Sequence, residues 1–405
     1  MHILFATSLL PEREPATGFE IANRAIADAY RSAGARVTVA GFRRPGAALP
    51  DVAHVDLGEI AIENAGAGRA RKVRWVLDAL RRGLPVGAAK LRVMPEATLL
   101  RRLRAAGPFD AVVLSAAQLP IAFPGLLTIA PPIFVAHNVE HLSAAEMGRS
   151  AGSAASRLLY RREAKLLRAA EERLCAAARV VHSLAVADAE RLGLAGDPRS
   201  IPLSLGIGRG AAPADDGARR FDVVMIGTWS WAPNRLGLDW FAAEVAPRLS
   251  PGIAVGVAGR FDGAPPPAPR NVSFLGRVPD AQAFVRSGRV VALATRGGTG
   301  VQLKTIETLE EGMPAVATPS ALRGIGAALP GNVRVASDGA AFAQALEDLV
   351  TRERAGEAVR LDGRAFAERQ RLDCERGVRA GLALVGLGGK EASGPAVPVM
   401  EALAS

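Results

Sequence analysis

The chain has 405 residues, enough for two ordinary domains, and its balance of 49% hydrophobic to 22% charged residues excludes general disorder. Its formal net charge is +10, and its two cysteines lie outside any spacing typical of a zinc site or a disulfide framework. Because no basic segment precedes the first apolar run, we expect no secretory signal and a cytoplasmic location.

Short apolar runs alternate with longer amphipathic stretches along the chain. In the first half, the runs predict strands at 2–7, 35–41, 111–115, 133–137, 178–183 and 200–203, with the clearest helix over 153–178. In the second half, we predict strands at 221–227, 253–258, 271–275, 290–294 and 315–318, and helices at 234–249, 281–287, 302–311 and 340–350. Residues 352–385 are expected to be largely helical. This alternation is typical of parallel β-α-β units and therefore of the α/β class.

A glycine-rich segment over 206–217 interrupts the alternation and predicts a domain boundary. We expect a Rossmann-like domain over 1–205, a second over 206–360, a helix over 361–385 that packs back toward the first domain, and a disordered tail over 386–405. Two doubly wound domains form a cleft between them, and ligands of such sheets bind beyond the carboxyl ends of the strands. The cleft is therefore the expected site.

The segment 66–106 carries eleven Lys or Arg residues against two acidic ones. Apolar residues recur within it near helical spacing, a pattern that fits a basic amphipathic helix at an anionic membrane surface. A solvated arginine-rich helix explains the pattern equally well. Nucleic acid is not expected as a partner, because aromatic residues are sparse and no recognition motif is present.

A motif that could hold a phosphate follows the strand predicted at 290–294. Gly298 and Gly300 leave the backbone bare just before a helix, whose N-terminal N–H groups favour anions. Lys304 lies in the first turn of that helix and Glu307 one turn later, near the same face. A cation there could meet a diphosphate, and the carboxylate could accept the two hydroxyls of a ribose.

The motif GTGVQLKTIE, with the Gly and Pro that follow it, resembles the retaining GT-B glycosyltransferases of group one, and most closely their capsule and exopolysaccharide sugar transferases. The resemblance implies a GT-B fold of two Rossmann-like domains, the first binding acceptor and the second a nucleotide sugar. It places Glu307 at the ribose, and Gly298, Gly300, Gln302 and Lys304 at the donor. Thr299 stands where most relatives carry a carboxylate near the donor sugar, and its hydroxyl is expected in the catalytic site in place of that carboxylate.

Other site residues follow from the same resemblance. FDVVMIGTWSWAPN resembles the opening of the family's C-terminal domain but lacks its usual Arg/Lys pair, so Arg235 and Arg260 are expected to replace that pair at the diphosphate. His137 and Glu140 follow a buried strand and are expected in the active site. Gly18 opens a helix that is expected to approach the donor. No metal or cofactor is expected besides the nucleotide sugar, because no set of metal ligands is written here.

The resemblance implies transfer of a hexose, with retention and without metal, to a lipid-linked or saccharide acceptor in polysaccharide biosynthesis. The basic segment 66–106 adds the expectation of a peripheral location at the inner face of the plasma membrane. Two alternatives stay open. A nucleotide-sugar epimerase of the same fold would need no acceptor. A catalytically silent GT-B protein acting as a partner would fit the threonine at position 299 and the missing Arg/Lys pair.

Overall fold

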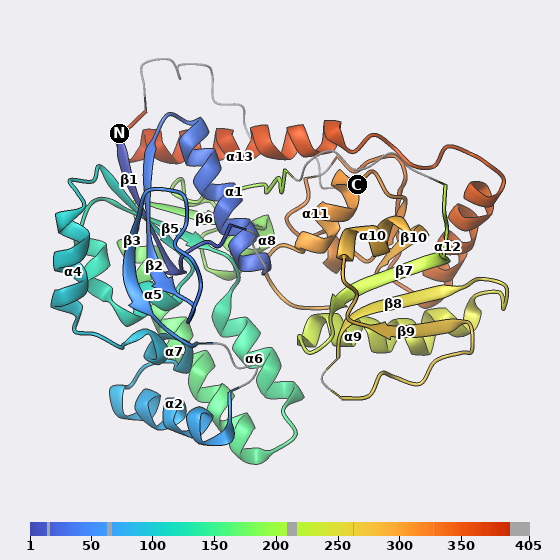
Figure 1. The fold of residues 1–405 in the computed structure, drawn as a ribbon, viewed down its shortest axis with the longest axis horizontal. Helices are drawn as coiled ribbons and strands as arrows, with labels where there is room; N and C mark the ends of the chain where they lie inside the picture. Colours follow the sequence, from blue (N-terminus) through green and yellow to red (C-terminus); the bar gives the residue numbers. More distant parts are fainter. Residues whose placement is uncertain (14–16, 63–66, 209–216, 262, 327, 389–405) are drawn as a thin grey trace.

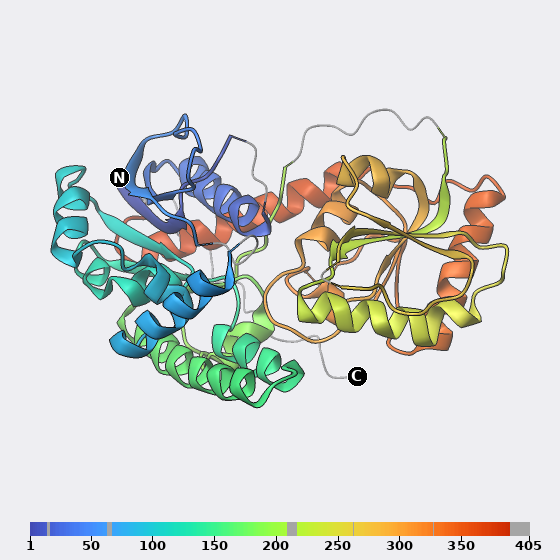
Figure 2. The ribbon, with the colours of Figure 1, turned by 60° about the horizontal axis from the view of Figure 1, so that its bottom comes forward.

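The computed structural model describes residues 1–13, 17–62, 67–208, 217–261, 263–326 and 328–388. It contains two six-stranded parallel sheets, each in its own lobe of the molecule (Figures 1 and 2). Counted from its own first strand, each sheet has the order 3-2-1-4-5-6 of a doubly wound fold. The α/β class and the expected pair of Rossmann-like domains are confirmed.

In the N-terminal sheet the order is β3-β2-β1-β4-β5-β6. Its strands are β1 (His2–Leu9), β2 (Arg36–Arg43), β3 (His54–Glu59), β4 (Ala111–Ser115), β5 (Pro132–Ala136) and β6 (Val180–Ser183). The helices of this domain are α1 (Gly18–Ser32), α2 (Arg69–Arg82), α3 (Val86–Leu91), α4 (Glu96–Ala105), α5 (Gln118–Ala122), α6 (Glu140–Ser150), α7 (Ala154–Ala177) and α8 (Val186–Arg191), with a 3-10 turn at Pro124–Thr128.

In the C-terminal sheet the order is β12-β11-β10-β7-β8-β9. Its strands are β7 (Phe221–Thr228), β8 (Val255–Arg260), β9 (Val272–Gly276), β10 (Gly288–Leu293), β11 (Ala315–Ala317) and β12 (Val333–Val335). The helices are α9 (Ala232–Trp240), α10 (Ala281–Arg286), α11 (Leu303–Glu310), α12 (Gly339–Arg354) and α13 (Arg364–Leu384), with short π and 3-10 turns at Phe241–Val245, Ala246–Arg248 and Pro319–Leu322.

Two predicted elements were wrong. Residues 200–203 are not a strand, because only Ser200 forms a single bridge, to Val181. The helix predicted over 234–249 ends at Trp240 and continues as π and 3-10 turns. The expectation that 352–385 is largely helical is confirmed, with one break between α12 and α13, where Gly356 has a φ of +82° that ends the first helix.

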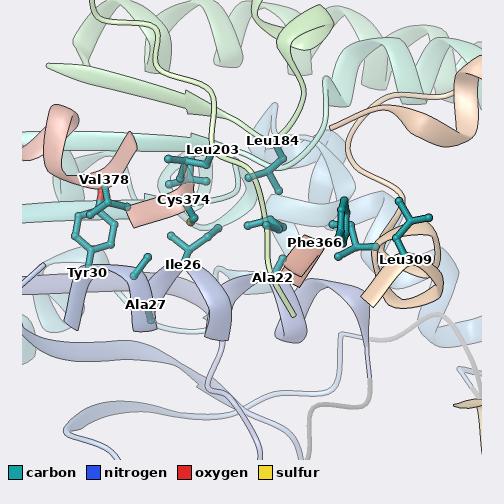
Figure 3. Packing of buried hydrophobic residues seen from close by; sticks show 14 of the residues in the cluster. Ala22, Ile26, Ala27, Tyr30, Leu184, Leu203, Leu309, Phe366, Cys374 and Val378 are labelled. Carbon is teal, nitrogen blue, oxygen red and sulfur yellow. The ribbon is translucent and has the colours of Figure 1, made fainter. Parts of the chain in front are cut away.

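Helix α13 lies across both lobes (Figure 1). On α1, the side chains of Ile26 and Tyr30 are fully buried and belong to one cluster with Cys374 and Val378 of α13 (Figure 3). Phe366, near the start of α13, lies beside Leu309 of α11 in the same cluster. The last helix therefore packs on elements of both domains, and it holds α1 and α11 on either side of the cleft. Of the tail expected to be disordered, 389–405 lies outside the described residues.

Candidate active site

A cavity of about 1060 Å³ lies between the two sheets, at the carboxyl ends of their strands. Its N-terminal wall comes from the loop after β1, the start of α1 and the end of β5. Its C-terminal wall comes from the ends of β7, β8 and β9 and from the first turns of α11. Both walls thus lie beside the point where the strand order of each sheet reverses.

Helix α11 brings three of the expected residues to the cavity wall: Gln302, Lys304 and Glu307. Gln302 is the N-cap residue of this helix, and its amide Nε2 is buried with no hydrogen-bond partner among the described residues. An unpaired donor beside the free N–H groups of a helix start suits an anionic ligand.

Lys304 is a cation of the cavity wall with an uncharged hydrogen-bond partner. Its Nζ donates to Oδ1 of Asn234 at 2.7 Å and lies 5.8 Å from the centre of the Trp229 ring. Burial, and secondarily the positive charge of Arg323, lowers the pKa of Lys304 to about 7. Such a group gains most from an anionic partner, because an anion would restore its ordinary ionisation.

Two further arginines reach the C-terminal wall from strand ends, Arg260 at the end of β8 and Arg277 just after β9. Thr228, at the end of β7, also lines this wall. The neighbouring Trp229 is buried, and its indole N–H donates to the carbonyl of Ala258. That indole therefore braces the two strand ends instead of facing a ligand.

Gly18 lets the two walls approach each other. It is the first residue of α1, and a Cβ atom at this position would lie 3.0 Å from Cδ1 of Leu303 on α11. The helix start is held by Thr17, which forms a capping box with Glu20. The N-termini of α1 and α11 therefore meet across the cavity, with glycine at the contact.

His137 directly follows β5 and lines the cavity on the N-terminal side. Its Nε2 is 2.8 Å from Oγ of Ser115, and its ring lies 5.0 Å from that of Phe19. Burial lowers the pKa of His137 to about 4, so the imidazole is neutral at physiological pH.

Thr299, Gly298 and Gly300 do not line the cavity. They belong to an interdomain clasp, which we define as residues 297–300 with their partners on α8, on α6 and in the segment just before α6. The Thr299 hydroxyl accepts from the backbone N–H of Val139 at 3.2 Å and lies 3.0 Å from Oγ of Ser143. The threonine is 4% exposed, so its hydroxyl is occupied by contacts between the domains. The expectation that this side chain acts in catalysis does not fit its position.

Gly300 lies at the centre of the clasp. Its backbone N–H donates to the fully buried carboxylate of Asp188 at 2.6 Å. Its φ is +74°, and a Cβ atom here would lie 2.1 Å from Oδ1 of Asn138. At Gly298, a Cβ atom would lie 2.7 Å from Cγ of Pro233. At both glycines a side chain would therefore collide with a neighbouring residue, Asn138 at Gly300 and Pro233 at Gly298.

Arg235 and Glu140 also lie away from the cavity. The Arg235 guanidinium pairs with Asp239 one turn later on α9, at 2.8 Å, and its place on the wall is taken by Asn234. Glu140, at the start of α6, is partly buried and accepts hydrogen bonds from Gln118 and Asn138, and desolvation raises the pKa of its carboxyl. Neither side chain is placed to meet a ligand in the cavity.

Two arginines of the site were not predicted from the sequence. Arg44, just beyond β2, lines the cavity and pairs with Glu12 at 2.7 Å and with the buried Glu20. Arg323 donates to the carbonyl oxygens of Gly297 and Gly300 and so braces the clasp. Their partners are far apart in sequence, and no local motif identifies them.

No cluster of three or more His, Cys, Asp or Glu residues suited to a metal ion occurs in the part of the chain that the structure describes. Within the same residues, no helix has the length and apolar character needed to cross a bilayer.

Residues 220–352 match the family model described as "Glycosyl transferases group 1". Among solved structures, the chain is similar to sucrose-phosphate synthase from Thermosynechococcus elongatus, with 14% identity and a TM-score of 0.60 over 94% of this chain and 99% of that one. It is also similar to HepE from Anabaena in complex with UDP and glucose, with 14% identity and a TM-score of 0.58 over 95% and 99% of the two chains.

A third similar structure is WaaG, a glycosyltransferase involved in lipopolysaccharide biosynthesis, with 16% identity and a TM-score of 0.54 over 95% of this chain and all of that one. No curated protein matches the chain. At these identities the structures show the GT-B fold. The family match lies within the C-terminal domain, and the shared fold extends over both domains.

Proposed function

We propose that this protein transfers a hexose from a nucleotide diphosphate sugar to a hydroxyl group of a lipid-linked or saccharide acceptor. The observation that carries the proposal is the placement of Lys304 and Glu307 one turn apart on α11, both on the wall of the interdomain cavity. This pair offers a cation to a diphosphate and a carboxylate to a ribose from a single rigid element.

The charge of the cavity supports an anionic donor. Its described lining includes the cations Arg44, Arg260, Arg277 and Lys304 and the carboxylates Glu12 and Glu307. Arg44 is paired with two carboxylates, whereas Lys304 donates to an uncharged amide, so Lys304 is the better partner for a phosphate oxygen. With the N-terminus of α11 it supplies positive charge for a leaving diphosphate, and the proposal requires no metal ion. HepE, one of the similar structures, also forms a complex with UDP-glucose, a donor of this class.

We further propose retention of configuration at the anomeric carbon. The bond from the anomeric carbon to the diphosphate breaks, a bond to the acceptor oxygen forms on the same face, and the acceptor proton passes to the leaving phosphate. The protein then supplies alignment and charge stabilisation and need not supply a nucleophile. His137 would contact a hydroxyl of the sugar, and the interdomain clasp would keep the two walls at a fixed distance.

The proposal of a lipid-linked acceptor is supported by an exposed apolar stripe on α2. Val73, Leu77 and Leu80 are about half exposed and lie at helical spacing on one stripe, whereas Ala79 on another face is buried. Basic residues of the same helix flank the stripe: Lys72, Arg74 and Arg81. An apolar stripe with basic flanks suits an anionic bilayer, so we propose peripheral attachment at the inner face of the membrane and a role in polysaccharide biosynthesis.

The test is a panel of nucleotide diphosphate sugars measured by thermal shift and calorimetry. A donor that binds the wild type should bind Glu307→Gln at least about tenfold more weakly, because a charge-assisted hydrogen bond is lost. Arg235→Ala is the matched control, since this arginine lies outside the cavity and should leave affinity unchanged. Absence of binding for every donor would favour the silent partner, and conversion of a donor sugar without acceptor would favour the epimerase.

A further inference from the structure

A chain of buried hydrogen bonds runs behind His137, on the side away from the cavity. Ser115 lies at the end of β4, Asn23 lies on α1, and Thr7 lies near the end of β1. Oγ of Ser115 is 2.8 Å from Nε2 of His137 and 2.6 Å from Oδ1 of Asn23, whose Nδ2 lies 2.8 Å from Oγ1 of Thr7. Thr7 and Ser115 are fully buried and Asn23 is 5% exposed, so water does not compete for these bonds.

We infer that Ser115 and Asn23 are positioning residues that hold His137 as a neutral imidazole protonated at Nε2, so that the unprotonated Nδ1 accepts a hydrogen bond from a hydroxyl group of the bound ligand. The inference rests on the proposed function for the nature of that ligand. The state of the imidazole itself follows from the free protein.

The donor–acceptor direction of these hydrogen bonds determines which ring nitrogen of His137 carries the proton. The Asn23 amide donates through Nδ2 to Thr7, which leaves Oδ1 to accept from the hydroxyl of Ser115. A serine hydroxyl has one proton to give, so towards His137 its oxygen can only accept. Nε2 of His137 is therefore the donor of their contact, and the second nitrogen, Nδ1, carries a lone pair.

Nδ1 has no hydrogen-bond partner among the described residues, and His137 lines the cavity. A second proton would create a buried imidazolium, which burial disfavours, as the lowered pKa of about 4 reflects. A lone pair attracts a hydroxyl proton and repels the oxygen of a phosphate or carboxylate. His137 thus selects the sugar part of a ligand and not its diphosphate.

A second buried histidine in the same domain provides an internal comparison. Nδ1 of His182 lies 2.8 Å from the backbone carbonyl oxygen of Ile201, and a carbonyl can only accept. His182 must therefore carry its proton on Nδ1. His137 and His182 are therefore expected to be opposite tautomers within one folded protein.

The first test is the long-range ¹H–¹⁵N spectrum of the free, full-length protein labelled at histidine, with the His137 signals assigned by their loss in His137→Gln. The expected result is protonation at Nε2 for His137 and at Nδ1 for His182. Protonation of His137 at Nδ1 would mean that the Asn23 amide has the opposite orientation, and it would overturn the inference. This readout needs neither donor nor activity, so it separates failure of the inference from failure of the proposed function.

The second test compares variants with the donor found by the panel. Ser115→Ala should lower kcat/KM about tenfold and give a mixture of His137 tautomers, whereas Ser115→Thr, which keeps a hydroxyl, should restore both. The matched control is Thr38→Val, because the Thr38 hydroxyl lies 2.8 Å from Nε2 of His2 in the same domain, outside the cavity. A loss in Ser115→Ala no larger than in Thr38→Val would show that Ser115 does not position His137.

Discussion

Nζ of Lys304 donates to Oδ1 of Asn234 at 2.7 Å, so the cation from α11 is held by an uncharged amide from α9. An amide oxygen compensates an ammonium group less than a carboxylate does, and burial accordingly lowers the pKa of Lys304 to about 7. The free protein therefore keeps its main candidate cation for the diphosphate close to half protonated near neutral pH.

This relationship predicts a pH dependence of binding. A nucleoside diphosphate favours protonated Lys304 and raises its pKa, so binding takes up protons at pH values above about 7. Affinity should be nearly constant below that value and fall by up to about tenfold per pH unit above it, until the pKa of the bound form is reached. Calorimetry at pH 8 in buffers of different ionisation enthalpy measures the uptake.

The control for this prediction is Lys304→Met, which keeps most of the length of the side chain and removes its charge. This variant should bind the diphosphate more weakly and take up about one proton fewer on binding at pH 8. An uptake that stays the same in Lys304→Met would assign the proton to another group and contradict the prediction.

The interdomain clasp predicts that removal of the Thr299 hydroxyl lowers the free energy of unfolding. Thr299→Val keeps the side-chain shape but leaves the buried N–H of Val139 without its acceptor. A buried N–H group without an acceptor lowers the free energy of unfolding by about 1–3 kcal/mol. For a domain of this size, each kcal/mol lowers the thermal midpoint by roughly 2–4 °C. Ser143→Ala removes only the side-chain partner of Thr299 and should cost less. Equal midpoints for wild type and Thr299→Val, measured by calorimetry, would show that the clasp contributes nothing.

Two glycines with the same backbone conformation distinguish two costs of substitution by alanine: the strain of the left-handed conformation, and the collision of the added Cβ atom with neighbouring atoms. Gly300 and Gly46 both have a φ of +74°, but a Cβ atom at Gly46 would meet nothing within 4 Å. At Gly300 it would lie 2.1 Å from Oδ1 of Asn138 and 2.6 Å from the carbonyl oxygen of His137. Gly46→Ala should cost about 1 kcal/mol from the left-handed conformation alone.

Gly300→Ala should cost several times more, because backbone atoms of the two domains must separate. It should also weaken donor binding, since the cavity walls move with the domains. Thermal midpoints and calorimetric affinities of the two variants check this. Similar effects in both variants would contradict the close approach described for Gly300.

The sequence predicted the central strands of both sheets but not β3 and β12. The central strands are continuous apolar runs because both faces of a parallel sheet are buried. β3 has a single buried residue, Leu57, and β12 has three residues of which two are exposed, so neither edge strand has an apolar run to recognise. The predicted strand at 200–203 runs beside β6, with backbone hydrogen bonds from Ile201 and Leu203 to Val181 and Ser183, but it forms only a single bridge and therefore no continuous ladder.

The site residues also differ in whether the sequence could predict their position. Lys304 and Glu307 could be predicted because one helical turn relates them and the resemblance fixes their register. Thr299 could not, because its partners come from the other domain and nothing near it in the sequence names them. Arg235 and Asn234 differ by one position, which on a helix is a rotation of about 100°, enough to send one side chain to Asp239 and the other to the cavity.

The exposed stripe of α2 predicts how the protein meets a membrane. Replacing Val73, Leu77 and Leu80 with Ser should lower affinity for anionic vesicles by about a hundredfold, at about 1 kcal/mol lost per side chain. The helix should remain folded, because its contacts to the domain are made elsewhere: Arg162 of α7 donates to the carbonyl oxygens of Ala79 and Leu84. Vesicle co-sedimentation and circular dichroism measure the two effects.

A matched control places the same change on the other domain. Leu236 and Leu361 are 45% and 44% exposed, similar to Leu77 at 48%. They lie in the C-terminal domain, outside the apolar stripe of α2. Their replacement with Ser should leave vesicle binding unchanged. Binding of the wild type should also weaken as salt rises, because the basic flanks of the stripe meet the surface through screened charges. Equal affinity for neutral and anionic vesicles, or equal loss in the two sets of variants, would remove α2 as the site of attachment.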